Sequence, residues 1–134
     1  MKPISTFLFS TLLGFFSCAH PPKVLDYIAL PPPAHVQAEL VSGQLKVQWE
    51  LPAPYVLARI KQFNVYASSK SLIYTPIKNL PQPLAVVPNH QNSCSITHFP
   101  PGQDLFIHVR SQNEKGDLSL PSLPEIHLKI ANSR

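Results

Sequence analysis

Two cysteines and six histidines are the side chains of this sequence best suited to nucleophilic or metal chemistry. Cys94 and His98 are close in sequence, but they lie in a predicted strand, where a rise of about 3.3 Å per residue separates them by roughly 13 Å. They therefore cannot act as a nucleophile and its base. Cys94 alternates with the apolar Ile96, which predicts a buried and unreactive thiol.

The histidines and acidic residues are dispersed along the chain and form no recognisable site. The histidines are His20, His35, His90, His98, His108 and His127. None of the spacings typical of a metal site occurs among them, or between them and the cysteines. The sequence also lacks a glycine-rich phosphate loop and a GxSxG motif. We therefore expect no cofactor, no metal and no small-molecule substrate, and we predict that the protein is not an enzyme.

Charge and length restrict the functions that remain. Charged residues make up 13% of the 134 residues, against about 25% in an average protein. The net charge of +4 is not gathered into a cluster of Lys and Arg, so no nucleic-acid partner is expected. A chain of this length holds one hydrophobic core, and its 16 prolines and four glycines indicate a folded domain rich in turns.

The first 17 residues have the anatomy of an export signal peptide. Lys2 precedes an apolar run over residues 7–16, and Ser17 and Cys18 follow it. The uncharged stretch, residues 3–19, is shorter than the ~20 residues that cross a bilayer as a helix. We therefore predict a signal peptide over residues 1–17 rather than a permanent membrane span.

The segment Phe15-Phe16-Ser17-Cys18 resembles the lipobox of bacterial lipoproteins, in which a small residue precedes the lipid-modified cysteine. The lipobox usually carries Leu, Val or Ile where this chain has Phe15. The resemblance implies that Cys18 receives acyl chains and attaches the protein to a membrane of the cell envelope. Ala19 stands in place of the Asp that favours inner-membrane retention in enterobacteria, which implies the outer membrane.

Two alternatives stay open for the N-terminal part. Ser17 and Ala19 also fit the small-x-small pattern of ordinary signal cleavage, which would release a soluble secreted binding protein. Residues 19–33 hold five prolines and no helical period, which predicts an extended, proline-rich tether over residues 18–32. The alternative for part of this tether is that Val24–Leu30 packs on the domain as an extra strand.

From residue 33 onward, apolar residues recur at every second position, as in half-buried strands. The segments with this period are residues 35–40, 44–50, 60–67, 93–98, 105–111 and 118–130. A short strand is also expected within the connection 68–92, and no helix is predicted. We therefore predict an all-β fold, an immunoglobulin-like β-sandwich of about seven strands in two antiparallel sheets.

The order of residues along these strands resembles that of a fibronectin type III domain over residues 33–131. The matching positions are Pro33, Trp49, Pro52, Phe63 to Tyr66, Phe99 to Gly102, Val109, Asn113, Gly116, Ser119 and Ser122. The family usually has Tyr where this chain has Leu105, so the hydroxyl that ties this corner to the backbone is missing. The resemblance implies a domain that binds a partner.

Two candidate binding sites follow from this expected fold. Alternation places Tyr66, Phe106, His108 and Arg110 on the sheet face away from the core, and aromatic side chains beside Arg are typical of binding hot spots. The alternative is that they are ordinary cross-strand pairs that cover the sheet. The segment Lys115-Gly116-Asp117 falls at a predicted hairpin tip, where some fibronectin domains display an Arg-Gly-Asp integrin signal. The alternative there is a tip that simply needs Gly with positive φ.

Signal, tether and domain together predict a lipid-anchored protein of the cell envelope. Its partners would be the membrane, through acylated Cys18, and another envelope protein bound by the fibronectin-like domain, within an envelope, secretion, pilus or cell-wall assembly. A surface adhesin or carbohydrate-binding lipoprotein is the first alternative. The second is the soluble secreted binding protein that cleavage after Ala19 would release.

Overall fold

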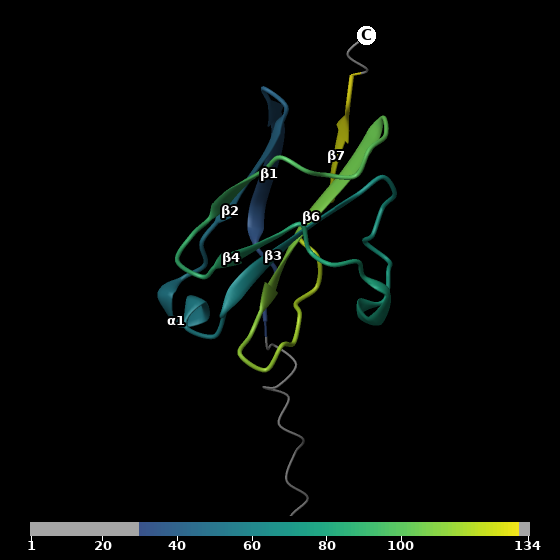
Figure 1. Cartoon of the computed structure of the whole chain (residues 1–134). Helices are drawn as coiled ribbons and strands as arrows, with labels where there is room; N and C mark the ends of the chain where they lie inside the picture. Colours follow the sequence, from purple (N-terminus) through teal and green to yellow (C-terminus); the bar gives the residue numbers. More distant parts are fainter. Residues whose placement is uncertain (1–29, 132–134) are drawn as a thin grey trace, which may run out of the picture.

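Two antiparallel sheets face each other in the computed structural model, which describes residues 30–131 (Figure 1). The three-stranded sheet has the order β1-β2-β5, and the four-stranded sheet has the order β4-β3-β6-β7. The strands are β1 Ala34–Val41, β2 Gln44–Glu50, β3 Gln62–Ser68, β4 Ala85–Pro88, β5 Ser93–Ile96, β6 Asp104–Gln112 and β7 Ile126–Lys129. The predicted all-β sandwich of seven strands in two antiparallel sheets is confirmed.

The signal peptide, Cys18 and nearly all of the tether lie outside the described residues. Of the segment Val24–Leu30, only Leu30 is described, and its side chain packs partly against the core. Pro33 is buried at the start of β1. The domain therefore includes the last residues of the predicted tether.

The core between the sheets consists of the alternate residues of each strand, because successive side chains of a strand point to opposite faces. Trp49 of β2 and Phe63 of β3 meet there, with ring centroids 5.4 Å apart and a tilted arrangement. The fully or nearly buried apolar residues are Leu45, Val47, Trp49, Ile60, Phe63, Val65, Ala67, Val87, Ile96, Leu105, Ile107 and Val109. Leu105, which replaces the usual corner Tyr, is one of them.

The β1–β2 hairpin closes with the shortest possible loop. Val41 pairs with Gln44, which leaves Ser42 and Gly43 as the two loop residues, both with positive φ (51° and 77°). Two successive positive φ values define the turn whose twist matches that of antiparallel strands. The turn fixes the register that places Trp49 in the core and Gln48 outside.

Two short helical turns contradict the prediction that the chain has no helix. They are α1, Pro54–Leu57, and the 3-10 turn η2, Ile77–Asn79. In α1, Pro54 occupies the first turn, where its missing N–H costs nothing, and Val56 packs partly against the core. A helix of one turn has no repeat of its apolar positions, so a period of 3.6 residues cannot reveal it.

Replacement of Trp49 tests this register. Trp49→Ala should lower the free energy of unfolding by about 3–5 kcal/mol, because it removes the largest side chain between the sheets. Gln48→Thr, on the exposed face of the same strand, should change it by less than about 0.5 kcal/mol. Urea denaturation of both variants measures the difference, and equal losses would show that the register is wrong.

Candidate functional site

The predicted interaction face is on the expected side of the sheet, but most of it is buried. Tyr66, His108 and Arg110 point away from the core, as alternation predicts, yet they are only 3%, 0% and 3% exposed. Phe106 is half-buried. The prediction of an exposed patch is therefore wrong for these three residues and is kept only for Phe106.

The chain itself covers this face of the four-stranded sheet. Segment 69–84 follows β3 and segment 113–125 follows β6, and the two are joined where the Leu72 backbone N–H donates to Glu125 Oε2 (3.1 Å). The same carboxylate oxygen lies 4.0 Å from His108 Nδ1. Alternation assigns a side chain to one face of a sheet, but it contains no information on what packs over that face.

Beneath this cover, three polar side chains form a closely packed cluster. The rings of Tyr66 and His108 stack with centroids 5.1 Å apart. Arg110 Nε donates to His108 Nε2 (3.1 Å), and Arg110 Nη1 donates to the Ser119 carbonyl oxygen (2.9 Å). Because a guanidinium has only donors, Nε2 must be the accepting nitrogen and Nδ1 carries the proton. The cluster therefore requires a neutral His108.

Burial and charge both keep His108 neutral. Burial, and then the charge of the neighbouring Arg110, together lower the pKa of His108 to about 4. Burial also lowers the pKa of Arg110. Protonation of His108 would replace its acceptor with a second N–H donor facing Arg110, and would place two cations side by side away from water.

This cluster predicts a loss of stability in acid. The His108 pKa is 6.5 in the unfolded chain and about 4 in the folded one, so the unfolded state binds the proton more readily. The effect is absent above pH 6.5 and grows as pH falls toward 4, where it reaches about 3 kcal/mol at ~1.4 kcal/mol per pH unit. Urea denaturation across this range should show the loss.

His108→Gln, which keeps an acceptor for Arg110 and cannot be protonated, should remove most of this pH dependence. The matched control is His90→Gln at an exposed position, which should leave the dependence intact. A His108→Gln variant that loses stability in acid as steeply as the parent would show that another group is responsible.

The half-buried Phe106 belongs to a separate surface cluster at the other end of β6. Its ring stacks on His127 of β7, with centroids 4.4 Å apart and planes 6° from parallel. His127 Nε2 lies 2.7 Å from Asp104 Oδ1, and Lys129 Nζ lies 3.0 Å from the same oxygen. Hydrogen bonds from His127 and then Lys129 lower the pKa of Asp104. These contacts are the cross-strand pairs that the alternative interpretation expected.

The Lys115-Gly116-Asp117 segment forms an exposed turn after β6. Gly116 has φ of 90°, and Asn113 Oδ1 accepts hydrogen bonds from the backbone N–H groups of Lys115 and Asp117. Asn113 Nδ2 also donates to the Asp117 carboxylate (3.0 Å). The turn thus needs a glycine for its backbone shape, as the alternative interpretation of this tripeptide expected. A receptor-binding role for it stays a prediction.

Cys94 is half-buried rather than fully buried, because β5 pairs with β2 alone and forms an edge of its sheet. Its side chain packs partly against the core. Burial raises the pKa of the thiol, which favours the protonated and less reactive form. The strand ends at Ile96, so His98 lies beyond it.

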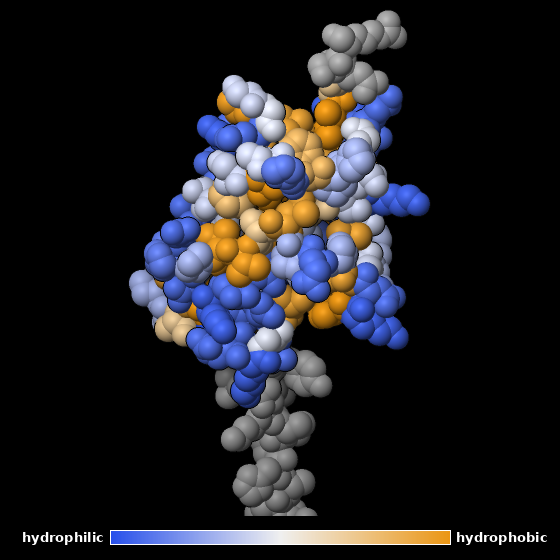
Figure 2. All heavy atoms as spheres, in the orientation of Figure 1, coloured by the Kyte–Doolittle hydropathy of each residue, from blue (hydrophilic) through white to orange (hydrophobic). Residues whose placement is uncertain are grey.

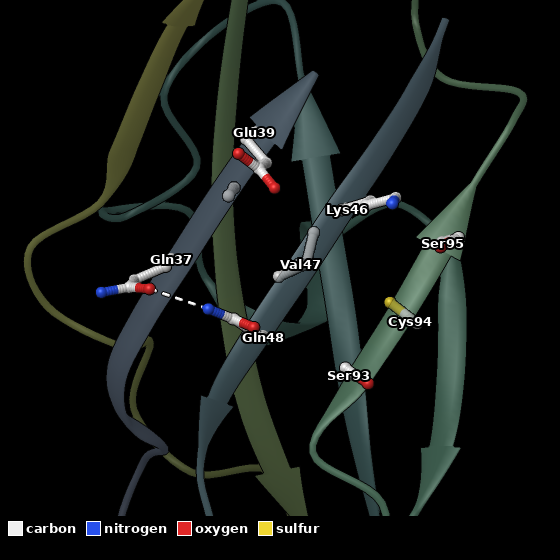
Figure 3. A pocket seen from close by; sticks show the side chains of 9 residues that line it. Gln37, Glu39, Lys46, Val47, Gln48, Ser93, Cys94 and Ser95 are labelled. Atoms are coloured by element: carbon white, nitrogen blue, oxygen red, sulfur yellow. Dashed lines mark hydrogen bonds between the residues drawn. The ribbon is translucent and has the colours of Figure 1, made fainter. Parts of the chain in front are cut away.

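The outer face of the three-stranded sheet is largely exposed in the part of the chain that the structure describes. Figure 3 shows polar side chains of this face on β1, β2 and β5. Most outward side chains there are exposed, and six of them line a shallow concavity of about 560 Å³. These six are Gln37, Glu39, Lys46, Gln48, Ser93 and Ser95. Gln48 Nε2 donates to Gln37 Oε1 (2.8 Å) across the β1–β2 pair. We call this surface the open sheet face.

The open sheet face offers amides, hydroxyls, one carboxylate and one ammonium, so it can make many directed hydrogen bonds but little apolar contact. This face is not among the predicted sites, although the sequence contains a signal for it. The alternation of β2 leaves Lys46 and Gln48 outside between buried residues, as clearly as it places Tyr66 outside in β3.

Two further properties concern the part of the chain that the structure describes. Within residues 30–131, no three His, Cys, Asp or Glu side chains are grouped closely enough to hold a metal ion. In the same range, no helix has both the length and the apolar character needed to span a membrane.

A sandwich with strand orders β1-β2-β5 and β4-β3-β6-β7 defines an immunoglobulin-like domain rather than a barrel or an open sheet. Within that class, the fibronectin type III domain model matches residues 31–127. The chain therefore belongs to the fibronectin type III family, as its sequence pattern implied.

Solved structures show the same fold at low sequence identity. An Fn3-like protein from Clostridium thermocellum superposes with a TM-score of 0.54 and 22% identity, over 75% of this chain and 93% of that protein. The spore cortex lytic enzyme SleM of Clostridium perfringens gives a TM-score of 0.52 and 17% identity over 75% of this chain. This chain spans only 29% of that enzyme. A search of curated proteins finds no match.

Proposed function

We propose that this chain is a lipid-anchored protein of the bacterial cell envelope whose fibronectin type III domain binds another envelope protein. Fibronectin type III domains generally serve as binding modules, and the match to this family supports a binding role. The partner belongs to an envelope or secretion assembly, and the anchor places the domain at the outer membrane. The domain binds through the open sheet face.

This proposal rests on the difference in exposure between the outer faces of the two sheets. The outer face of β3 and β6 is closed by the chain's own segments, whereas the outer faces of β1, β2 and β5 are lined by exposed polar side chains. A partner can reach the open sheet face without any rearrangement of the domain. The low charge of the chain lowers the desolvation cost of such contact.

The face of the domain shown in Figure 2 has a mixed apolar and polar character. Figure 2 shows apolar side chains gathered over the middle of the visible face, with hydrophilic side chains around them. Interfaces of this kind combine a central apolar area with a polar rim.

The lipid anchor is the first part of the proposal to test. The mature protein should begin at an acylated Cys18 and partition into detergent with the membrane fraction. Cys18→Ser should block processing and leave the uncleaved chain. Mass spectrometry of the N-terminus decides the question, because a soluble protein that begins at His20 would favour the secreted alternative.

The docking surface is the second part to test. Gln48→Arg combined with Ser95→Arg adds bulk and charge to the open sheet face, and it should reduce recovery of the crosslinked partner from intact cells by at least tenfold. The melting midpoint should change little, because both side chains are exposed.

The matched control replaces two exposed residues at the other candidate site. Lys115→Ala with Asp117→Ala should leave recovery of the partner unchanged. If the turn variant loses the partner while the open-face variant keeps it, the binding site belongs to the turn and the adhesin alternative gains support.

A carbohydrate is the second candidate ligand, because the amides and hydroxyls of the open sheet face suit a hydroxyl-rich molecule. The same pair of variants tests it in a binding assay with isolated cell-wall polysaccharide. Loss of polysaccharide binding in Gln48→Arg with Ser95→Arg, without loss of a crosslinked protein, would favour this candidate.

A further inference from the structure

The uncharged segment Leu118-Ser-Leu-Pro-Ser-Leu-Pro124 runs along the edge of the four-stranded sheet, where the backbone N–H groups of Ser119 and Ser122 donate to carbonyl oxygens of β6. Two of its hydroxyls are fastened to the backbone of β6. Ser119 Oγ accepts from the Ser111 N–H, and Ser122 Oγ accepts from the Val109 N–H, both at 2.9 Å. Both serines are buried. The segment is therefore fixed against β6 by its polar side chains.

This attachment leaves the leucines of the segment facing solvent. Leu120 is 75% exposed and Leu123 is 69% exposed. Arg110 Nη1 holds the same stretch through the Ser119 carbonyl oxygen, so neither leucine can turn inward without breaking buried hydrogen bonds. A surface that holds two leucines outward in a fixed position is suited to an apolar environment beyond the domain.

The segment lies where the N-terminal part of the chain joins the domain. Ser111 Oγ donates to the Pro31 carbonyl oxygen (2.8 Å), while the N–H of the same residue bonds Ser119. Tyr55 of α1 is 79% exposed and lines a small cavity together with Pro31, Pro32 and Pro33. Figure 1 shows the start of β1, the end of β6 and α1 at the same end of the sandwich.

We infer that this part of the domain rests on the lipid bilayer, with Leu120 and Leu123 at the boundary between headgroups and acyl chains and Tyr55 at the end of the sandwich where their segment begins. The inference rests on the proposed lipid anchor at Cys18. The chain from Cys18 to Leu30 spans at most about 40 Å when fully extended. The bilayer is thus always within reach of this surface, which we call the leucine edge.

A bilayer fits the leucine edge better than a protein partner does, for two physical reasons. An anchor raises the effective concentration of lipid near the edge far above that of any protein in solution, so even weak apolar contact is populated. Tyr is also a side chain that membrane interfaces favour, because its ring is apolar and its hydroxyl is polar.

The charges at the two ends of the segment do not oppose this contact. Residues 118–124 contain no charged side chain. Of the flanking carboxylates, Asp117 is bonded to Asn113 Nδ2 and Glu125 accepts from the Leu72 N–H. Insertion of the leucines therefore does not require an unpartnered carboxylate to leave water.

Fluorescence quenching in vesicles tests this inference with the full, acylated chain. Leu120→Cys, in a Cys94→Ser background, is labelled with an environment-sensitive fluorophore, and the protein is reconstituted into vesicles of phosphatidylethanolamine and phosphatidylglycerol. Lipids with brominated acyl chains should quench this label severalfold more strongly than a label at the control Val86→Cys, an exposed position on β4. Equal quenching at the two positions would overturn the inference.

A second measurement separates this result from the fate of the anchor. The N-terminal mass is determined on the same sample. Acylated Cys18 with an unquenched label at position 120 refutes the leucine edge and leaves the anchor standing. An unacylated N-terminus refutes the anchor. The soluble protein is then mixed with vesicles: quenching of the label at position 120 would support membrane contact by the leucine edge, and no quenching would refute it.

A third experiment tests whether a protein, rather than lipid, contacts the leucine edge. Leu120→Ser with Leu123→Ser should keep the crosslinked partner, because the partner binds the open sheet face, and should abolish quenching at a label on Tyr55→Cys. If this variant instead loses the partner, a protein rather than lipid occupies the leucine edge and the inference is wrong.

Discussion

Burial of β6 on both of its faces is the constraint on which the rest of the structure depends. One face supplies Leu105, Ile107 and Val109 to the core, and the other carries His108 and Arg110. A buried guanidinium must find acceptors within the protein, and Arg110 finds them in His108 Nε2 and the Ser119 carbonyl oxygen, whereas His108 Nδ1 has no hydrogen-bond partner among the described residues. The segment after β6 is also held against the edge of the sheet by hydrogen bonds to this strand.

That constraint also decides which surfaces remain for binding. The segments that follow β3 and β6 cover the buried polar side chains on the outer face of the four-stranded sheet. In the described range, the three-stranded sheet has no buried polar side chain on its outer face, and that face stays exposed. The same segments expose Leu120 and Leu123, because their serines are the residues turned toward β6. The open sheet face and the leucine edge thus have a common cause in the polarity of one strand.

Local pattern predicted the strands well and their surroundings poorly. The alternation of Leu45, Val47 and Trp49 located β2 with its observed bounds, since a half-buried strand shows its face directly in its sequence. The same rule put Tyr66 and Arg110 on the correct face but could not show that residues distant in sequence cover them. Contacts of that kind depend on tertiary packing, as does the single turn of α1.

The prolines of the segment after β6 affect how copies of this protein behave beside one another. The edge strand of a sheet has unpaired backbone N–H and C=O groups, to which a strand from a neighbouring molecule can bind. Here Pro121 and Pro124 interrupt the edge of the four-stranded sheet before β7, and Pro88 ends β4 at its opposite edge. A chain with so few charges has little electrostatic repulsion to keep its copies apart. Proline at both edges supplies that protection against aggregation by limiting the backbone donors that a second chain would need.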